Sequence, residues 1–368
     1  MSSAQASGKP NLLGKSAEEL RALAMSLGEP AYRGAQLYHA LYAENCFDFA
    51  AMTALPAALR KELQSGWSIS LPKIQRRYPS ADGTMRYVLA LEPGHESAEN
   101  SGTTIETVFM PEANRQTVCV STQAGCAVDC RFCLTATLGL IRNISPAEIL
   151  GQVIVALEDH RPVLKPQTNV VLMGQGEPLL NYDAVIAALR ILMDPKGMAI
   201  SPKHVTLSTS GIVPGIERLA RETIRPKLAI SLNASNDGQR DKIMPINRKY
   251  PLEKLLDACR RYPLRSWEHL TFEYVLLGGF NDAPEDARRV ARLVAKIRCK
   301  LNLIPWNPGN LPYHPPDAAR IEEFRRLLTE KGVRAFVRYS RGQDVMAACG
   351  QLALLESSGA PHLAQISI

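Results

Sequence analysis

Residues 126–133 read CAVDCRFC, and this run decides how the rest of the chain is interpreted. It places Cys126, Cys130 and Cys133 at spacings of four and three residues. Thiolates that lie so close together in sequence can ligate one iron–sulfur cluster. A [4Fe-4S] cluster has four irons, so three protein ligands leave one iron open to a substrate or cofactor. The run therefore predicts one reactive [4Fe-4S] cluster rather than a simple electron carrier.

Zinc is the main alternative for these thiols. Structural zinc favours four ligands in two separated pairs, and the sequence has no second pair to complement residues 126–133. The lone thiols Cys46, Cys259 and Cys299 lie in apolar or helical surroundings, where a buried structural cysteine is the ordinary interpretation. The spacing instead resembles the CX3CX2C signature of radical S-adenosylmethionine (SAM) enzymes. In those enzymes SAM chelates the fourth iron and is split to a 5′-deoxyadenosyl radical.

Composition indicates a globular protein with a large core. The chain has 368 residues, of which 46% are hydrophobic, and this suggests one large α/β domain with a smaller appendage. Residues 1–10 are small and polar, and no apolar stretch approaches the length of a membrane span. We therefore expect a cytoplasmic protein that does not associate with membranes. Because the cytosol keeps thiols reduced, the eight cysteines are not expected to form a disulfide framework.

The charge of the chain favours a polyanionic partner. Lys and Arg outnumber Asp and Glu by 43 to 36, which gives a net charge of +7. A solvated surface is the ordinary interpretation of a basic cluster taken alone, but if the catalytic core acts on a nucleic acid we expect phosphate contacts instead. The clusters in question are Arg60 and Lys61; Lys73, Arg76 and Arg77; and Arg334, Arg338 and Arg341.

The first part of the chain is predicted to be helical and the next part to be a hairpin. Apolar residues recur at helical spacing over 17–27, 31–42 and 55–65. Strand-like alternation follows over 84–91 and 103–110, separated by a long tip that includes 94–101. We therefore expect a small helical domain over 1–70 and a β-hairpin extension over 71–111.

From residue 112 to residue 368, strand-like and helix-like segments alternate. Strands are expected at 117–121, 169–173, 204–208, 227–231, 271–276 and 301–305, and helices at 146–157, 182–193, 213–221, 252–262 and 284–297. A helix over 316–331, a strand over 334–339 and a helix from residue 343 follow. Six successive βα units imply a parallel sheet that is closed or half-closed. The expected fold class is α/β, with a partial (β/α)6 TIM-like barrel.

The polar loops of this barrel are expected to meet at one mouth. In such barrels, function collects in the loops at the carboxyl ends of the strands. The first strand runs into residues 126–133, and the second runs into GQGEP at 174–178. The third, fourth and sixth end at 208–211, 231–233 and 305–308. Small residues there would let SAM approach closely, and Glu177 could accept a hydrogen bond from the ammonium group of SAM.

The chain resembles the RlmN family of dual-specificity RNA methyltransferases, whose sister family is the Cfr resistance methyltransferases. The resemblance covers nearly the whole chain and rests on several separate motifs in order. They are YRGAQ at 32–36, IETV at 105–108, CVSTQAGC at 119–126, GQGEPLLN at 174–181, LSTSG at 207–211, MPIN at 244–247 and ACGQL at 348–352.

The resemblance implies methylation of C2 of an adenine in 23S ribosomal RNA, at the peptidyl transferase centre, and of the adenine next to the anticodon in transfer RNA. Cys349 would take a methyl group from one SAM, and a second SAM would supply the radical that activates this methyl group. Cys119 would then release the product through a transient disulfide with Cys349. Glu106 would act as the proton acceptor.

By the same matching, SAM would be held by Gly176, Glu177, Ser208, Ser231, Leu232, Asn233 and Asn307. One position departs from the family, where relatives commonly read Ser-Leu-His over 231–233. Asparagine can donate and accept hydrogen bonds but carries no titratable proton. The resemblance further implies a monomer, an RNA-binding role for 1–70 and a flavodoxin-type electron donor.

Two alternatives remain open on sequence alone. Methylation at adenine C8, as in Cfr, would use the same two cysteines and the same cluster, because a small rotation of the base exchanges the two carbons. A non-catalytic RNA-binding module with a structural metal is the alternative from another class. It would make Cys119 and Cys349 dispensable.

Overall fold

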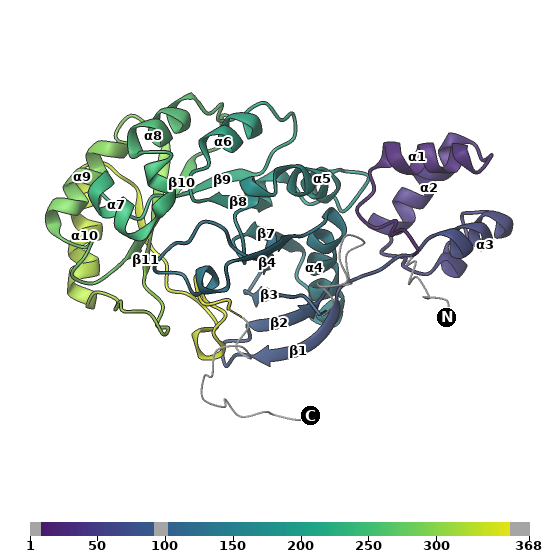
Figure 1. The fold of residues 1–368 in the computed structure, drawn as a ribbon, viewed down its shortest axis with the longest axis horizontal. Coiled ribbons are helices and arrows are strands. Elements are labelled where there is room, and N and C mark those ends of the chain that lie inside the picture. Colours follow the sequence, from purple (N-terminus) through teal and green to yellow (C-terminus); the bar gives the residue numbers. More distant parts are fainter. Residues whose placement is uncertain (1–8, 92–101, 354–368) are drawn as a thin grey trace, which may run out of the picture.

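The computed structural model describes residues 9–91 and 102–353. The hairpin tip at 94–101 lies outside the described residues. Three short helices stand to one side of a large α/β unit in Figure 1. They are α1 (Ala17–Ser26), α2 (Ala31–Tyr42) and α3 (Ala57–Gly66). Their apolar faces belong to the same buried core as the α/β unit, and the Tyr38 hydroxyl donates to Asp194 at 2.9 Å.

A ten-stranded sheet forms the centre of the molecule, in the order β1-β2-β3-β4-β7-β8-β9-β10-β11-β12. Neighbouring strands from β4 to β12 are parallel, whereas β1 to β4 pair antiparallel. The strands are β1 (Lys73–Pro79), β2 (Met85–Ala90), β3 (Thr104–Pro111), β4 (Arg115–Cys119), β7 (Gln167–Leu172), β8 (Val205–Thr209), β9 (Lys227–Ser231), β10 (Leu270–Leu276), β11 (Cys299–Pro305) and β12 (Ala335–Val337). Since β1 and β12 are its two edges, the parallel part is a half-open barrel, as predicted.

Helices cover the outside of this half-barrel (Figure 1). They are α4 (Pro146–Asp159), α5 (Tyr182–Met193), α6 (Val213–Leu219), α7 (Asp237–Ile243), α8 (Leu252–Arg261), α9 (Pro284–Val294) and α10 (Ala318–Glu330). The first begins with a capping box, in which the Ser145 hydroxyl accepts from the Glu148 N–H and the Glu148 carboxylate accepts from the Ser145 N–H. Among the described residues, no helix is long and apolar enough to cross a membrane.

The predicted hairpin is confirmed, since β2 pairs antiparallel with β3 from Met85 opposite Phe109 to Ala90 opposite Thr104. The prediction missed β1, which pairs with the other side of β2. Five of the seven residues of β1, KIQRRYP, are exposed and three are charged, so its edge position is set by pairing rather than by burial. A small separate sheet of β5 (Gln123–Gly125) and β6 (Leu140–Asn143) was also not predicted.

The helix expected from Gln343 is wrong. The chain there makes only a short 3-10 turn over Gln343–Val345, flanked by Gly342 and Met346 in the left-handed region with φ of 62° and 53°. Left-handed residues on both sides prevent an α-helix from extending. The Asp344 carboxylate instead accepts from the Ser80 hydroxyl at 2.6 Å.

This C-terminal segment links the two edges of the sheet. It leaves β12 and reaches the turn between β1 and β2, where Asp82 accepts from the Gly342 N–H at 3.1 Å and pairs with Arg341 at 3.3 Å. Although burial opposes it, hydrogen bonds from Thr84 and Gly342 hold the pKa of Asp82 well below its usual range. The segment thereby crosses the open side of the half-barrel and carries Cys349 to the mouth.

Candidate active site

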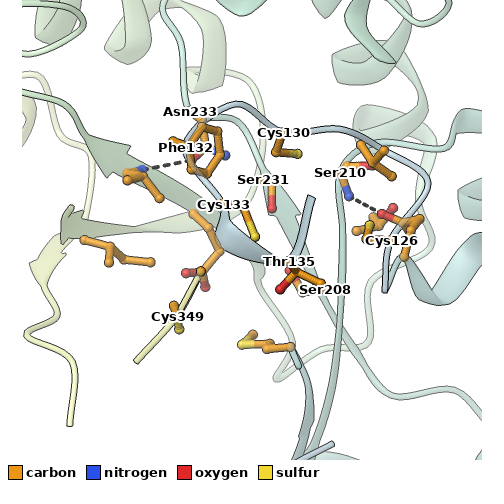
Figure 2. A pocket seen from close by; sticks show the side chains of 18 of the residues that line it. Cys126, Cys130, Phe132, Cys133, Thr135, Ser208, Ser210, Ser231, Asn233 and Cys349 are labelled. Carbon is orange, nitrogen blue, oxygen red and sulfur yellow. Dashed lines mark hydrogen bonds between the residues drawn. The ribbon is translucent and has the colours of Figure 1, made fainter. Parts of the chain in front are cut away.

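The loops at the carboxyl ends of β4, β7, β8, β9 and β11 line one pocket, as the sequence predicted. Its empty volume is about 970 Å³, including space open to solvent. Figure 2 shows the labelled thiols and hydroxyls around this space. The predicted residues that line it are Cys126, Cys130, Cys133, Gly176, Glu177, Ser208, Ser231, Asn233, Asn307 and Cys349. Cys119, Glu106 and Leu232 are not among the lining residues.

The three-cysteine loop is held from several sides. The Cys126 N–H donates to Gly139 at 2.8 Å, and the Arg131 N–H donates to Ile243 at 2.9 Å. The indole N–H of Trp306 donates to the Phe132 carbonyl at 3.0 Å. These bonds hold the backbone of the loop in place.

Burial shapes the chemistry of these thiols. It raises the pKa of Cys126 to about 12 and also raises the pKa of Cys130 and of Cys133, with mutual repulsion between the sulfurs adding to the effect at Cys130. Buried thiolates therefore require a cationic partner, which the irons of a cluster would supply. Within the described ranges, no three His, Cys, Asp or Glu side chains lie close enough together to hold a single metal ion. Three thiols of one loop that face one cavity fit the donor set of a cluster with three protein ligands.

Cys349 lies on the C-terminal segment against this loop. The Leu134 N–H donates to the Gly350 carbonyl at 2.7 Å, and the Thr135 hydroxyl donates to the Leu352 carbonyl at 2.7 Å. Cys349 itself is exposed and faces the mouth of the pocket (Figure 2). The protein atoms around its sulfur, together with the nearby Glu273 and Cys133, raise the pKa of Cys349 to about 11.

The amide of Asn307 completes the attachment of this segment. It donates to the Cys349 carbonyl at 3.0 Å and to the Ser340 hydroxyl at 2.9 Å. Its oxygen accepts from Gln343 at 3.0 Å. Asn307, which the family resemblance assigns to SAM, thus positions the backbone of Cys349.

Cys119 lies behind Cys349, at the end of β4. It is 8% exposed and packs in a small apolar cluster with Val108, Ala347 and Leu352. Burial, with a contribution from the charge of Cys349, raises the pKa of Cys119. Both thiols are free. Although the two cysteines are 230 positions apart in sequence, Cys119 packs against residues two and three positions from Cys349.

Glu106 is fully buried on β3 and does not line the pocket. Its carboxylate forms an ion pair with the equally buried Arg86 of β2. The amide of Gln175 donates to Glu106 at 3.4 Å and to the Leu352 carbonyl at 3.5 Å. Gln175 therefore connects Glu106 to the segment that carries Cys349. The role of Glu106 as proton acceptor stays a prediction.

Glu177 and Gly176 shape the SAM side of the pocket. The two oxygens of Glu177 accept from the N–H groups of Leu179 at 3.1 Å and Ser210 at 2.6 Å, and burial raises the pKa of Glu177. The carboxyl group therefore ties two loops together, which the sequence did not indicate. At Gly176, φ is 99° and a Cβ would lie 2.6 Å from the Gln123 side chain. Only glycine fits there.

Asn233 has a structural role at the end of β9. Its φ is 55°, a left-handed conformation that asparagine tolerates. Its side-chain oxygen accepts from the Val275 N–H at 2.8 Å, and its amide points to the Met244 sulfur at 3.4 Å. The preceding Leu232 is fully buried in the main core. Its side chain is not among those that line the pocket, and the assignment of Leu232 to SAM, which the family resemblance implies, stays a prediction.

An Asn233→Ala substitution is expected to lower the free energy of unfolding by about 2 kcal/mol, because it orphans the Val275 N–H and leaves alanine in a left-handed conformation. Urea unfolding followed by circular dichroism measures this difference. Asn233→Asp, which keeps an acceptor oxygen, is the matched control and should lose less. Equal stability of Asn233→Ala and the unmodified protein would contradict the structural role of Asn233.

Sequence reasoning missed Glu273. It lies on the inner face of β10, lines the pocket and accepts from Asn302 at 3.0 Å, and burial raises its pKa. A carboxylate inside an otherwise apolar strand, TFEYVL, was the signal that could have found it.

The chain matches two protein families. Residues 120–293 match the Radical SAM superfamily, and residues 10–69 match the ribosomal RNA large subunit methyltransferase N-terminal domain. A solved radical SAM methyltransferase from Sphaerobacter thermophilus superposes with a TM-score of 0.85 at 41% identity, and the match covers 93% of this chain and 99% of that chain.

Curated relatives match over most of their length. A probable dual-specificity RNA methyltransferase RlmN from Koribacter versatilis is 47% identical, covering 89% of this chain and 96% of the relative. The dual-specificity RNA methyltransferase RlmN from Anaeromyxobacter dehalogenans is 46% identical over 96% of this chain and 94% of its own. That from Geobacter sulfurreducens is 42% identical over 97% of both chains.

Proposed function

Because the chain belongs to the RlmN family of radical SAM RNA methyltransferases, we propose that it methylates C2 of an adenine in 23S ribosomal RNA. We extend the proposal to the adenine next to the anticodon in transfer RNAs. One observation carries it: Cys349 lines the pocket that it shares with the three-cysteine loop, and Cys119 packs against Ala347 and Leu352 of the segment that carries Cys349. Family membership sets aside the non-catalytic RNA-binding module.

The pocket can hold the cofactors that this reaction needs. Cys126, Cys130 and Cys133 would ligate one [4Fe-4S] cluster, and the loops with Gly176, Ser208 and Ser231 would hold SAM beside it. When bound, the cluster and SAM supply a 5′-deoxyadenosyl radical that removes hydrogen from a methyl group. We propose that two SAM molecules are used per turnover, one as methyl source and one as radical source.

Cys349 is the proposed carrier of the methyl group. Adenine C2 is electron-poor and does not attack an electrophilic methyl donor, so a protein nucleophile must take the methyl group first. Cys349 is exposed at the mouth, and its backbone is fixed by Leu134, Thr135 and Asn307 through the bonds described above. A methyl group on its sulfur would lie at the place where an RNA base enters.

Cys119 is the proposed releasing thiol. Attack of the Cys119 sulfur on the Cys349 sulfur forms a disulfide and breaks the carbon–sulfur bond to the RNA. The electron pair of that bond stays on the former methyl carbon, which takes up a proton and becomes the product methyl group. The disulfide must then be reduced before the next turnover. For the cluster, a flavodoxin-type protein is the proposed electron donor. Before the disulfide forms, the adduct must lose one electron, for which the oxidised cluster would be the acceptor, and its C2 proton, for which Glu106 is the proposed acceptor.

The remaining parts of the chain are proposed to serve RNA recognition. We assign residues 1–70 to an RNA-binding domain, 71–111 to the hairpin extension and 112–368 to the catalytic core, in a protein that acts as a monomer.

The proposed function is tested by anaerobic incubation of the iron-loaded protein with SAM, a reductant and a 23S RNA fragment, followed by nucleoside mass spectrometry. We expect 2-methyladenosine. Formation of 8-methyladenosine would instead assign the protein to the Cfr reaction.

A further inference from the structure

The inner face of the half-barrel continues beyond the pocket toward the amino ends of the strands. Successive side chains of a strand point to opposite faces, so residues two or four apart share one face. Ser231 and Ile304 line the pocket. Lys227 of β9 and Lys300 of β11, each four residues earlier, therefore point to the same interior. Both lysines are half-buried, whereas the outward positions between them and the pocket, Leu228, Ile230, Leu301 and Leu303, are almost fully buried.

The edge strand β12 continues this face. Phe336 lies opposite Asn302 in the register of β11 and β12, so the two side chains share the inner face. Phe336 is 44% exposed, and the Arg338 guanidinium lies 5.6 Å from the centre of its ring. Arg334 and Arg338 flank Phe336 at two residues on either side and are both exposed. We call Lys227, Lys300, Arg334, Phe336 and Arg338 the inner basic face.

The positive charges of this face lack direct counter-charges. Within the part of the chain that the structure describes, none of the two lysines or two arginines forms an ion pair. Burial lowers the pKa of Lys227 and of Lys300. Repulsion from Lys300 and Arg115 lowers the pKa of Lys227 further, and repulsion from Arg338 and Arg334 does the same at Lys300. Glu268 and Glu273 offset the repulsion only in part. An anion bound on this face would reduce the repulsion between these positive charges.

We propose that the inner basic face binds the single-stranded RNA next to the target adenine, with phosphates against Lys227, Lys300, Arg334 and Arg338 and a base stacked on Phe336. This deepens the proposed function and rests on it. Grooves that bind single strands combine cationic side chains that follow the backbone with aromatic rings that stack on bases. The face is continuous with the reactive mouth through Glu273, which lines the pocket and bonds to Asn302. A strand lying there would deliver its next base to Cys349.

Binding of a labelled RNA stem-loop, measured by fluorescence anisotropy at several salt concentrations with the iron-loaded full chain, tests this assignment. Removing one phosphate contact, as in Arg338→Ala or Lys300→Gln, should reduce the slope of log affinity against log salt by about 0.7. Phe336→Ala should weaken binding on the order of tenfold with little change of slope. Lys296→Gln is the matched control, since Lys296 is exposed beyond α9 on the outer layer, and should change neither quantity.

Further measurements separate the possible outcomes. Lys300→Arg and Arg338→Lys keep the positive charge, so both should show the salt slope of the unmodified protein. That result would show that the reduced slope of Lys300→Gln and Arg338→Ala comes from the lost charge and not from a loss of fold. If the unmodified protein cleaves SAM but methylates no RNA, the proposed function fails. If it methylates RNA while the face variants bind RNA as Lys296→Gln does, the inner basic face is not the RNA site. If flavodoxin reduces the cluster of the face variants more slowly than that of the unmodified protein, while dithionite reduces both equally and RNA binding is unchanged, the face would instead be the binding site of the electron donor.

Discussion

A Cys119→Ala variant is expected to stop with its RNA substrate covalently attached to Cys349. Cys119 is the free thiol that packs against the segment that carries Cys349. Without it, no sulfur remains in place to break the carbon–sulfur bond, so the adduct accumulates instead of methylated RNA. Denaturing electrophoresis with radiolabelled RNA would show a protein–RNA band that survives heat and detergent, and methylated product should fall below about 1% of the unmodified protein.

The double variant Cys119→Ala with Cys349→Ala is the control for this adduct. It removes the proposed attachment point and should give no band. Loss of one sulfur from a small apolar cluster costs about 1 kcal/mol, so both proteins are expected to fold. Methylated RNA formed by Cys119→Ala at the rate of the unmodified protein would remove Cys119 from the mechanism.

A Cys130→Ala variant is expected to lose both its iron and its RNA methylation. Two thiols of the loop would remain, and two protein sulfurs hold a [4Fe-4S] cluster poorly. Iron and sulfide content, the visible absorption of the anaerobically reconstituted protein and formation of 5′-deoxyadenosine should all fall to background. Cys46→Ala, which removes a thiol far from the pocket in the N-terminal part, should keep all three. Full cluster content in Cys130→Ala would mean that another residue is the ligand.

The barrel was predictable because its elements have strong local signals. The strand 227–231 and the helix 182–193 were predicted with the bounds that the structure shows. In the first case a short apolar run follows Pro226, and in the second a helical pattern follows Asn181. The missed strand β1 has no such signal, because five of its seven residues, including Arg76 and Arg77, are exposed. Its place depends on β2, and no local pattern contains that information.

The convergence of the site loops was also predictable, because the carboxyl ends of parallel strands meet at one edge. The exact partners of the side chains were not. Arg86 and Glu106 lie 20 residues apart and pair only because β2 and β3 are neighbours in the sheet. Likewise, Glu177 was assigned to the SAM ammonium, but its oxygens are held by two backbone N–H groups. Such pairings depend on register, which the sequence does not state.

The basic clusters illustrate the same limit. Arg77 forms two hydrogen bonds with Asp159 at 2.7 and 3.0 Å, and Arg341 pairs with Asp82. Arg60 donates to the Ala50 carbonyl. These arginines hold the fold together, whereas Arg334 and Arg338 of the same predicted clusters stand on the inner basic face. Which cations are available to RNA thus depends on where the fold places the carboxylates.

The central claim is that the methyl group travels through Cys349 and loses a hydrogen there before it reaches RNA. Turnover with SAM whose methyl group carries three deuteriums, followed by mass spectrometry of the RNA nucleosides, tests this most directly. We predict 2-methyladenosine with two deuteriums in its methyl group, because one deuterium is removed while the group is on the sulfur. A methyl group that retains all three deuteriums would show direct transfer from SAM and would contradict the account.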